Sequence, residues 1–301
     1  MLAEQLGKKT MLVDGGMGAE LIRRAGVPMK TLFSAPSLNL TQPVMVKQIH
    51  REYLQAGSDI ITTNTFTANE LMLGIYGKEA ELVQQNVLGV RLVREAVDEH
   101  FHHTGKRCYV GANIGPLPFP EKHLHGKTQE ELAGIYETQL MALLGERPDL
   151  LIVECAYHVG TVQALGLLVD RVFQTAYERI PIMLTATMNE NPNDIDGVSA
   201  AEFFAAASQM KPDVIGFSCG SGLDHIEPVL MALSDTVHVL MPNAGVPDEN
   251  GEYPVNMQAL ARRVIELSER YDIRVLGGCC GTNPAYIAAL SAQLCEKANQ
   301  E

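Results

Sequence analysis

Two adjacent cysteines, Cys279 and Cys280, lie in a Gly-Gly-Cys-Cys-Gly run, and Cys219 lies in an earlier Phe-Ser-Cys-Gly run. Small neighbours leave thiols open to close approach, and adjacent cysteines suit a disulfide framework poorly. Three thiolates leave one position of a tetrahedral zinc ion open, as catalytic sites do, whereas structural sites fill all four. Soft thiolates select zinc or cuprous copper over magnesium or calcium, and zinc is the commoner outcome. The three cysteines therefore predict a catalytic Zn2+ site.

The open position of such a site suits a thiol substrate. A free thiol is mostly protonated at neutral pH, and coordination to zinc would present it as thiolate. The substrate sulfur would then be the nucleophile without help from a general base. We therefore predict no catalytic residue beyond the metal-activated thiolate itself.

Short β-rich runs recur along the chain and carry these cysteines at their ends. Each run is followed by a longer helical pattern, which is typical of parallel βα units. The runs are Met11 to Gly15, Asp59 to Asn64, Tyr109 to Ile114, Leu150 to Glu154, Ile182 to Thr187, Val214 to Ser218, Val237 to Pro242 and Val275 to Gly278. Eight such runs predict an α/β protein with one domain over residues 1–301, a (β/α)8 TIM barrel. A doubly wound open sheet is the alternative, because a count of strands does not establish closure.

Helix boundaries are also readable. Thr128 with Glu131 and Ser199 with Glu202 have capping-box spacing. Gly57 is expected to end a helix that begins near Pro43.

In a TIM barrel the residues that follow the strands lie on one face, where barrel enzymes hold their active sites. Those rim positions are Asp14, Asn64, Asn113, Glu154, Thr187, Cys219, Asn243 and the Cys279–Cys280 pair. Side chains alternate along a strand, so only one of the neighbours Glu154 and Cys155 should point inward. We assign Glu154 inward; the opposite phase would bring Cys155 to the metal as a fourth thiol.

The composition narrows the possible partners. The formal net charge is -13, which repels phosphate backbones and anionic lipid surfaces. We therefore expect no nucleic-acid and no membrane partner, and a small-molecule substrate instead. The sequence shows neither a signal peptide nor a stretch apolar enough to span a bilayer, and a cytoplasmic location is expected.

Several motifs spread over the chain resemble the homocysteine S-methyltransferase family. They are DGGMGAEL at 14–21, DIITTNTFTAN at 59–69, FSCGSG at 217–222, PNAGVPDENGEYP at 242–254 and VLGGCCGTNPAYIAAL at 275–290. The last of them is highly specific. The PNAG and GEYP segments are most similar to the homocysteine-binding module of cobalamin-dependent methionine synthase.

The resemblance implies a homocysteine-binding barrel that transfers a methyl group to L-homocysteine and yields methionine. It assigns Cys219, Cys279 and Cys280 as zinc ligands, and Asp14 and Glu154 as acidic residues near the substrate's amino group. The candidate substrate-binding set is completed by Asn64, Asn243 and Ser218. Ser218 departs from the family pattern, which usually has asparagine before the first zinc cysteine.

The methyl donor is expected from outside, because 301 residues leave no room for the folate-binding and cobalamin-binding domains of the full synthase. The candidates are a methyl-corrinoid protein, methylfolate and S-methylmethionine. Two alternatives remain open at this point. One is a repurposed subunit that binds zinc and a thiol without methyl transfer. The other is a serine hydrolase, since Gly216, Ser218 and Gly220 spell G-x-S-x-G and His225 and His238 follow.

Overall fold

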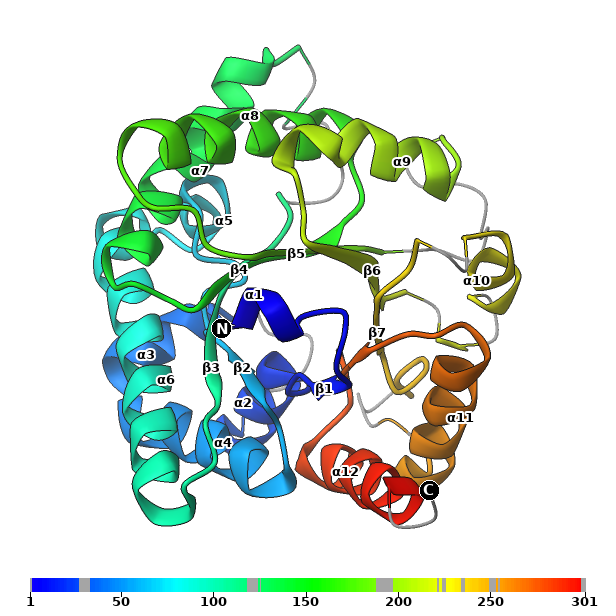
Figure 1. Cartoon of the computed structure of the whole chain (residues 1–301). Helices are drawn as coiled ribbons and strands as arrows, with labels where there is room; N and C mark the ends of the chain where they lie inside the picture. Colours follow the sequence, from blue (N-terminus) through cyan, green and yellow to red (C-terminus); the bar gives the residue numbers. More distant parts are fainter. Residues whose placement is uncertain are drawn as a thin grey trace.

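The computed structural model describes residues 2–26, 33–117, 124, 126–187, 197–220, 222–223, 226–233, 236–248, 253 and 255–298. Eight strands form one sheet in which all neighbouring strands run parallel (Figure 1). They are β1 (Met11–Leu12), β2 (Ile60–Thr62), β3 (Tyr109–Ile114), β4 (Leu150–Ala156), β5 (Ile182–Ala186), β6 (Val214–Cys219), β7 (Val239–Pro242) and β8 (Val275–Leu276). All eight predicted strands are confirmed; β1, β2, β5, β7 and β8 are shorter than predicted, whereas β4 and β6 are longer.

The sheet curls into a barrel. Its strand order is β1-β8-β7-β6-β5-β4-β3-β2, so β1 and β2 are the two ends of the order. A parallel bridge between Val13 and Ile60 joins these ends, and the Asp59 amide donates to the Leu12 carbonyl at 2.7 Å across the same seam. The predicted (β/α)8 barrel is therefore confirmed, and the open doubly wound sheet is wrong.

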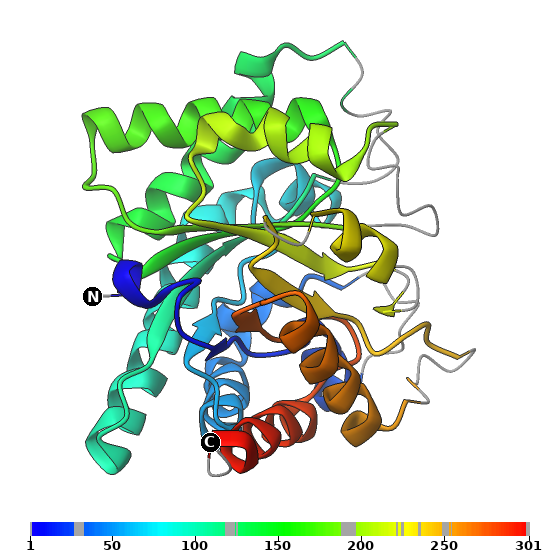
Figure 2. The same ribbon diagram turned by 45° about the vertical axis from the view of Figure 1, so that its right-hand side comes forward.

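Helices surround the barrel on its outside, as Figures 1 and 2 show. The α-helices outside the barrel are α2 (Met17–Ala25), α3 (Leu38–Thr41), α4 (Pro43–Ala56), α5 (Glu70–Ile75), α6 (Leu82–Thr104), α7 (Gln129–Gly145), α8 (Val159–Thr175), α9 (Ala200–Ala206), α10 (Glu227–Leu233), α11 (Met257–Arg270) and α12 (Pro284–Ala298), with short 3-10 turns η1 (Ala35–Ser37), η2 (Glu79–Glu81) and η4 (Ala207–Met210). Both predicted capping boxes are present, at the starts of α7 and α9. Gly57 ends α4 in the left-handed conformation, as predicted.

Two apolar clusters stabilise the barrel. The larger one lies between the strands and the surrounding helices. The smaller one fills the barrel interior and includes Val13, Ile60, Ile152, Met183 and Val239. The short helix α1 (Leu2–Gln5) lies across one end of the barrel (Figure 1), and its Leu2, with the following Leu6, belongs to the interior cluster. That end is therefore filled with hydrophobic side chains.

Within the described ranges, no helix combines the length and the hydropathy that crossing a membrane requires.

Candidate active site and metal centre

A cavity of about 420 Å³ lies where the strands end, opposite α1. This volume is in the range of small-molecule sites. Residues at or just after the ends of several different strands line it, including Asp14, Thr62, Asn113, Glu154 and Cys219. The site is thus at the carboxyl ends of the strands, where barrel enzymes hold their active sites.

The three predicted metal-binding cysteines meet in this cavity. The Cys219 sulfur is 3.6 Å from the Cys280 sulfur, and the Cys279 sulfur is 3.9 Å from the Cys280 sulfur. The Cys219 and Cys279 sulfurs lie within 4.8 Å of each other. Ligands about 2.3 Å from a tetrahedral zinc ion stand about 3.8 Å apart. The spacing and the soft donor set therefore fit zinc, although its presence stays a prediction.

Backbone hydrogen bonds fix the Cys279–Cys280 turn. The Cys279 amide donates to the Pro242 carbonyl, and the Ala244 amide donates to the Cys280 carbonyl, both at 2.8 Å. The Thr282 hydroxyl donates to the Cys279 carbonyl at 2.7 Å. Gly281 is left-handed with φ 79°, and a Cβ there would lie 2.3 Å from the Tyr253 ring. The turn is therefore preorganised to present both thiols.

The thiols are electrostatically coupled. Hydrogen bonds from the Cys155, Cys279 and Cys280 thiols lower the pKa of Cys219 well below its usual value. The thiolate of Cys219 in turn raises the pKa of Cys280 to about 12. A single thiolate in this cluster is thus stabilised by neighbouring S–H groups, and a cation would take the place of their protons.

Cys155 also lines the cavity, which corrects the expected alternation along β4. The pairing of β4 with β5 shifts register between Val153 and Ala156, and Cys155 has φ 56°. This bulge turns both Glu154 and Cys155 toward the cavity. The Cys155 sulfur lies within 4.8 Å of the Cys219 and Cys279 sulfurs. The cluster therefore contains four thiols.

Two buried carboxyl groups, those of Asp14 and Glu154, line the cavity. Asp14, 1% exposed, accepts hydrogen bonds from the Thr62 amide at 2.9 Å and the Thr62 hydroxyl at 3.2 Å. Burial raises the pKa of Asp14 well above its usual value, and the charge of Glu154 adds to this. Burial likewise raises the pKa of Glu154 to about 7. The hydrogen bond that the Asn113 amide donates to Glu154 at 2.6 Å lowers this pKa and so offsets part of the increase. A pair of desolvated carboxyl groups is suited to receive an ammonium group.

The other predicted substrate-binding residues are placed differently. Asn64 lines the cavity, but its Nδ2 donates to the Ala35 carbonyl and to Asn39 Oδ1. Ser218 and Asn243 are buried outside the cavity lining; Ser218 is hydrogen-bonded to Cys155 and Thr185, and Asn243 donates to the Gly220 carbonyl. Their roles in substrate binding stay predictions.

Asn113 is the functional candidate that the sequence did not single out for binding. Its Nδ2 holds Glu154, and its buried Oδ1 has no hydrogen-bond partner among the described residues. Its position at the rim was the only available signal. This oxygen is therefore a hydrogen-bond acceptor that the described residues leave unpaired.

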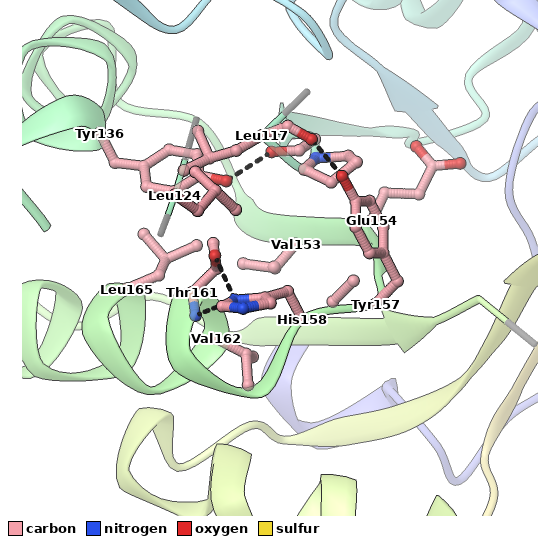
Figure 3. Close-up of a pocket in the computed structure, with 13 residues that line it drawn as sticks. Leu117, Leu124, Tyr136, Val153, Glu154, Tyr157, His158, Thr161, Val162 and Leu165 are labelled. Carbon is pink, nitrogen blue, oxygen red and sulfur yellow. Dashed lines mark hydrogen bonds between the residues drawn. The ribbon is translucent and has the colours of Figure 1, made fainter. Parts of the chain in front are cut away.

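A second, much smaller cavity of about 20 Å³ adjoins the site between β4, α7 and α8 (Figure 3). Around it, the Tyr136 hydroxyl donates to the Gly115 carbonyl at 3.1 Å and the Tyr157 hydroxyl donates to the Leu117 carbonyl. His158 Nδ1 accepts from the Thr161 amide at 3.0 Å and caps α8. A space of this size holds about one water molecule, so this second cavity is too small for a substrate.

The structure argues against the serine hydrolase. His238 directly precedes β7 and so lies at the opposite end of the barrel from Ser218, which is near the end of β6. His225 lies outside the described residues. Among the described residues, Ser218 Oγ contacts Thr185 Oγ1 at 2.7 Å and the Cys155 amide at 3.2 Å, and no imidazole. The G-x-S-x-G pattern here is a coincidence of a glycine-rich strand end.

Comparisons with known proteins agree with this geometry. The family model for homocysteine S-methyltransferase matches residues 11–294. The fold is similar to that of the homocysteine methyltransferase MmuM from Escherichia coli. Its metallated form has a TM-score of 0.78 at 23% identity, with 95% of this chain and 96% of that chain covered, and its oxidized form has a TM-score of 0.79 at 23% identity, with 97% and 98% covered. At this identity the structural likeness shows the fold alone.

Proposed function

The chain belongs to the homocysteine S-methyltransferase family, and from that premise we propose that it methylates the thiol of L-homocysteine to methionine on a zinc ion held by Cys219, Cys279 and Cys280. The chain is thus a methyltransferase. The observation that carries the proposed zinc chemistry is the convergence of these thiols, at 3.6 and 3.9 Å, in a cavity that also holds two buried carboxyl groups.

The donor set suits the proposed metal. When bound, zinc lowers the pKa of a coordinated thiol, so that the substrate sulfur is present as thiolate at neutral pH. Cys219, at the end of β6, and Cys279 and Cys280, in the turn that follows β8, would hold the ion, and the substrate sulfur would reach it from the cavity. No general base is needed in the methyl-transfer step.

Asp14, Glu154 and Asn113 are proposed to hold the amino group of homocysteine. An ammonium group favours the ionised form of each carboxyl, so binding would lower both raised pKa values. Thr62 orients Asp14, and Asn113 orients Glu154, through the hydrogen bonds described above. This anchoring would fix the distance between the amino group and the sulfur and align the thiolate with the donor.

The methyl group is proposed to come from an external donor: a methyl-corrinoid protein, methylfolate or S-methylmethionine. The homocysteine sulfur supplies the electron pair of the new S–C bond, and the donor's leaving atom keeps the pair of the bond that breaks. Six free cysteines, three of which must stay reduced for this chemistry, favour a cytoplasmic location.

The test measures zinc content, homocysteine binding and methionine formation with methylcobalamin, methylfolate and S-methylmethionine in turn. Wild-type protein is expected to hold about one zinc per chain and to form methionine with one of the donors. Cys280→Ala should lose both, while Cys295→Ala, which changes an exposed cysteine in α12, should keep both.

Zinc and homocysteine binding without methionine from any donor would instead support the repurposed subunit. Absence of zinc from the wild-type protein would contradict the proposed mechanism.

A further inference from the structure

Two turns of the site are bonded directly to each other. Residues 14–16 follow β1 and residues 278–282 follow β8, and these two strands are neighbours in the sheet. The Gly278 amide donates to the Asp14 carbonyl at 3.0 Å. Asp14, a proposed partner of the substrate's amino group, is therefore joined by a backbone hydrogen bond to the turn that carries the proposed metal ligand Cys279.

The Thr282 hydroxyl also joins the two turns. Thr282 is 1% exposed, and its Oγ1 donates to the Cys279 carbonyl at 2.7 Å. The same Oγ1 accepts from the Gly16 amide at 3.1 Å, and the Thr282 carbonyl accepts from that amide at 3.3 Å. A hydroxyl has one donor and two acceptor positions, so this single group serves both turns. Loss of the hydroxyl would remove a contact on each side at once.

Glycines allow the two backbones to approach the hydroxyl this closely. A Cβ on Gly15 would lie 2.7 Å from Thr282 Oγ1, and a Cβ on Gly278 would lie 2.3 Å from the same atom. Both distances are shorter than real Cβ atoms show, so no larger residue fits at either position without a shift. A movement of one turn would therefore displace the other.

From these contacts, and resting on the function proposed above, we propose that Thr282 is a positioning residue that sets the distance between Asp14 and the metal-binding thiols and so selects homocysteine over cysteine. Three carbon atoms separate the sulfur from the amino nitrogen in homocysteine, and two separate them in cysteine. When both binding groups are fixed, homocysteine reaches them together, whereas cysteine reaches only one at a time. A methylene group is worth about 10- to 200-fold in discrimination when a site holds its shape.

The test measures the Kd values of homocysteine and cysteine for zinc-loaded wild type, Thr282→Val and Thr282→Ser by titration calorimetry. Thr282→Val removes the hydroxyl and keeps the branched shape, whereas Thr282→Ser keeps the hydroxyl. Thr282→Val should raise the Kd of homocysteine about tenfold, the effect of one lost buried hydrogen bond, and that of cysteine less than about threefold. Thr282→Ser should keep both Kd values within about threefold of wild type.

A double-mutant cycle with Asp14→Asn separates positioning from a general loss of stability. If Thr282 acts through Asp14, Asp14→Asn should weaken homocysteine binding at least about threefold less in the Thr282→Val protein than in wild type. Ser268→Ala is the matched control, because Ser268 is buried in α11 and its hydroxyl also donates to the carbonyl three residues before it, at 2.8 Å. This control should leave the ratio of the two Kd values unchanged.

Equal weakening of homocysteine and cysteine binding by Thr282→Val, a Thr282→Ser protein as weak as Thr282→Val, or additive effects in the cycle would overturn the positioning role and leave the proposed function standing. No homocysteine binding by the zinc-loaded wild type would overturn the proposed function itself. Thr282→Ala, measured in the same way, replaces Thr282→Val if the valine variant does not fold.

Discussion

The two ends of the barrel are made from different kinds of side chain. At the end covered by α1, the interior is filled by residues such as Leu6, Ile152 and Val239, all of them almost fully buried. At the other end, the same strands carry carboxyl groups and thiols around a cavity of about 420 Å³. β4 contributes to both ends, with Ile152 in the apolar layer and Glu154 and Cys155 at the cavity. Along β4, the residues that stabilise the barrel and those that line the cavity are therefore only two or three positions apart.

The largest effect is expected at the cavity end from Cys219→Ala. The Cys219 sulfur lies 3.6 Å from the Cys280 sulfur and within 4.8 Å of the Cys155 and Cys279 sulfurs. Its loss should remove zinc and reduce methyl transfer more than about a hundredfold, because even outer-shell changes cost 10- to 100-fold. Alanine keeps the Cβ at φ 63°, so the melting temperature of the metal-free protein should hardly change. Zinc content, rate and melting temperature measure the three effects. Retained zinc would contradict the predicted ligand set.

The opposite result is expected at the apolar end from Ile152→Ala. Ile152 is fully buried, and removing its side chain should lower the free energy of unfolding by about 2–5 kcal/mol. Zinc content and the KM for homocysteine should stay unchanged below the unfolding transition. Leu167→Ala, at a half-exposed position in α8, is the control for a small stability change. Loss of zinc in the Ile152 variant would show that the two ends are coupled.

A pH-dependent effect is expected from Glu154. Because burial raises the pKa of Glu154 from 4.5 to about 7, the folded metal-free protein binds more protons than the unfolded chain between these values. Its stability should therefore fall as the pH rises from about 4.5 to about 7, by up to about 3 kcal/mol from this group. Denaturant unfolding at several pH values should show this slope in wild type and a smaller one in Glu154→Gln. Equal slopes would contradict the assignment.

The smallest effects come from a pair of glycines near the start of α2. A Cβ on Gly16 would lie 2.6 Å from the Cys279 carbonyl oxygen, so Gly16→Ala should displace the cysteine turn and cost about 1–3 kcal/mol. Gly18 has no atom within 4 Å of that position and lies within α2, so Gly18→Ala should stabilise by about 0.5 kcal/mol. Thermal unfolding with zinc analysis measures both. A harmless Gly16→Ala would mean that the turn tolerates movement.

The regular parts of the molecule were predictable from sequence. Each strand is a short apolar run followed by a helix start, and the capping residues Thr128 and Ser199 are where local spacing predicts them. That Cys219, Cys279 and Cys280 lie close together was also predictable, because adjacent thiols at strand ends suit few roles other than metal binding. Because a barrel brings the carboxyl ends of its strands together, the residues at those ends can be predicted from sequence to form one site.

The local exceptions were not predictable. Alternation fails at Cys155, because the bulge and the left-handed backbone depend on hydrogen bonds to Thr185 and Ser218 on two other strands. Asn113 stood out only once its unpartnered oxygen and its bond to Glu154 were visible. Such features arise from tertiary contacts, which residue periodicity does not encode.

The helix α1 also has a consequence for kinetics. Because Leu2 and Leu6 fill one end of the barrel, acceptor and donor must use the opening at the carboxyl ends of the strands. Asp14, Glu154 and Cys279 are buried within that cavity, so a donor already seated there would stand in the path of homocysteine. Turnover should therefore follow a compulsory order in which homocysteine enters first and methionine departs last, after the demethylated donor.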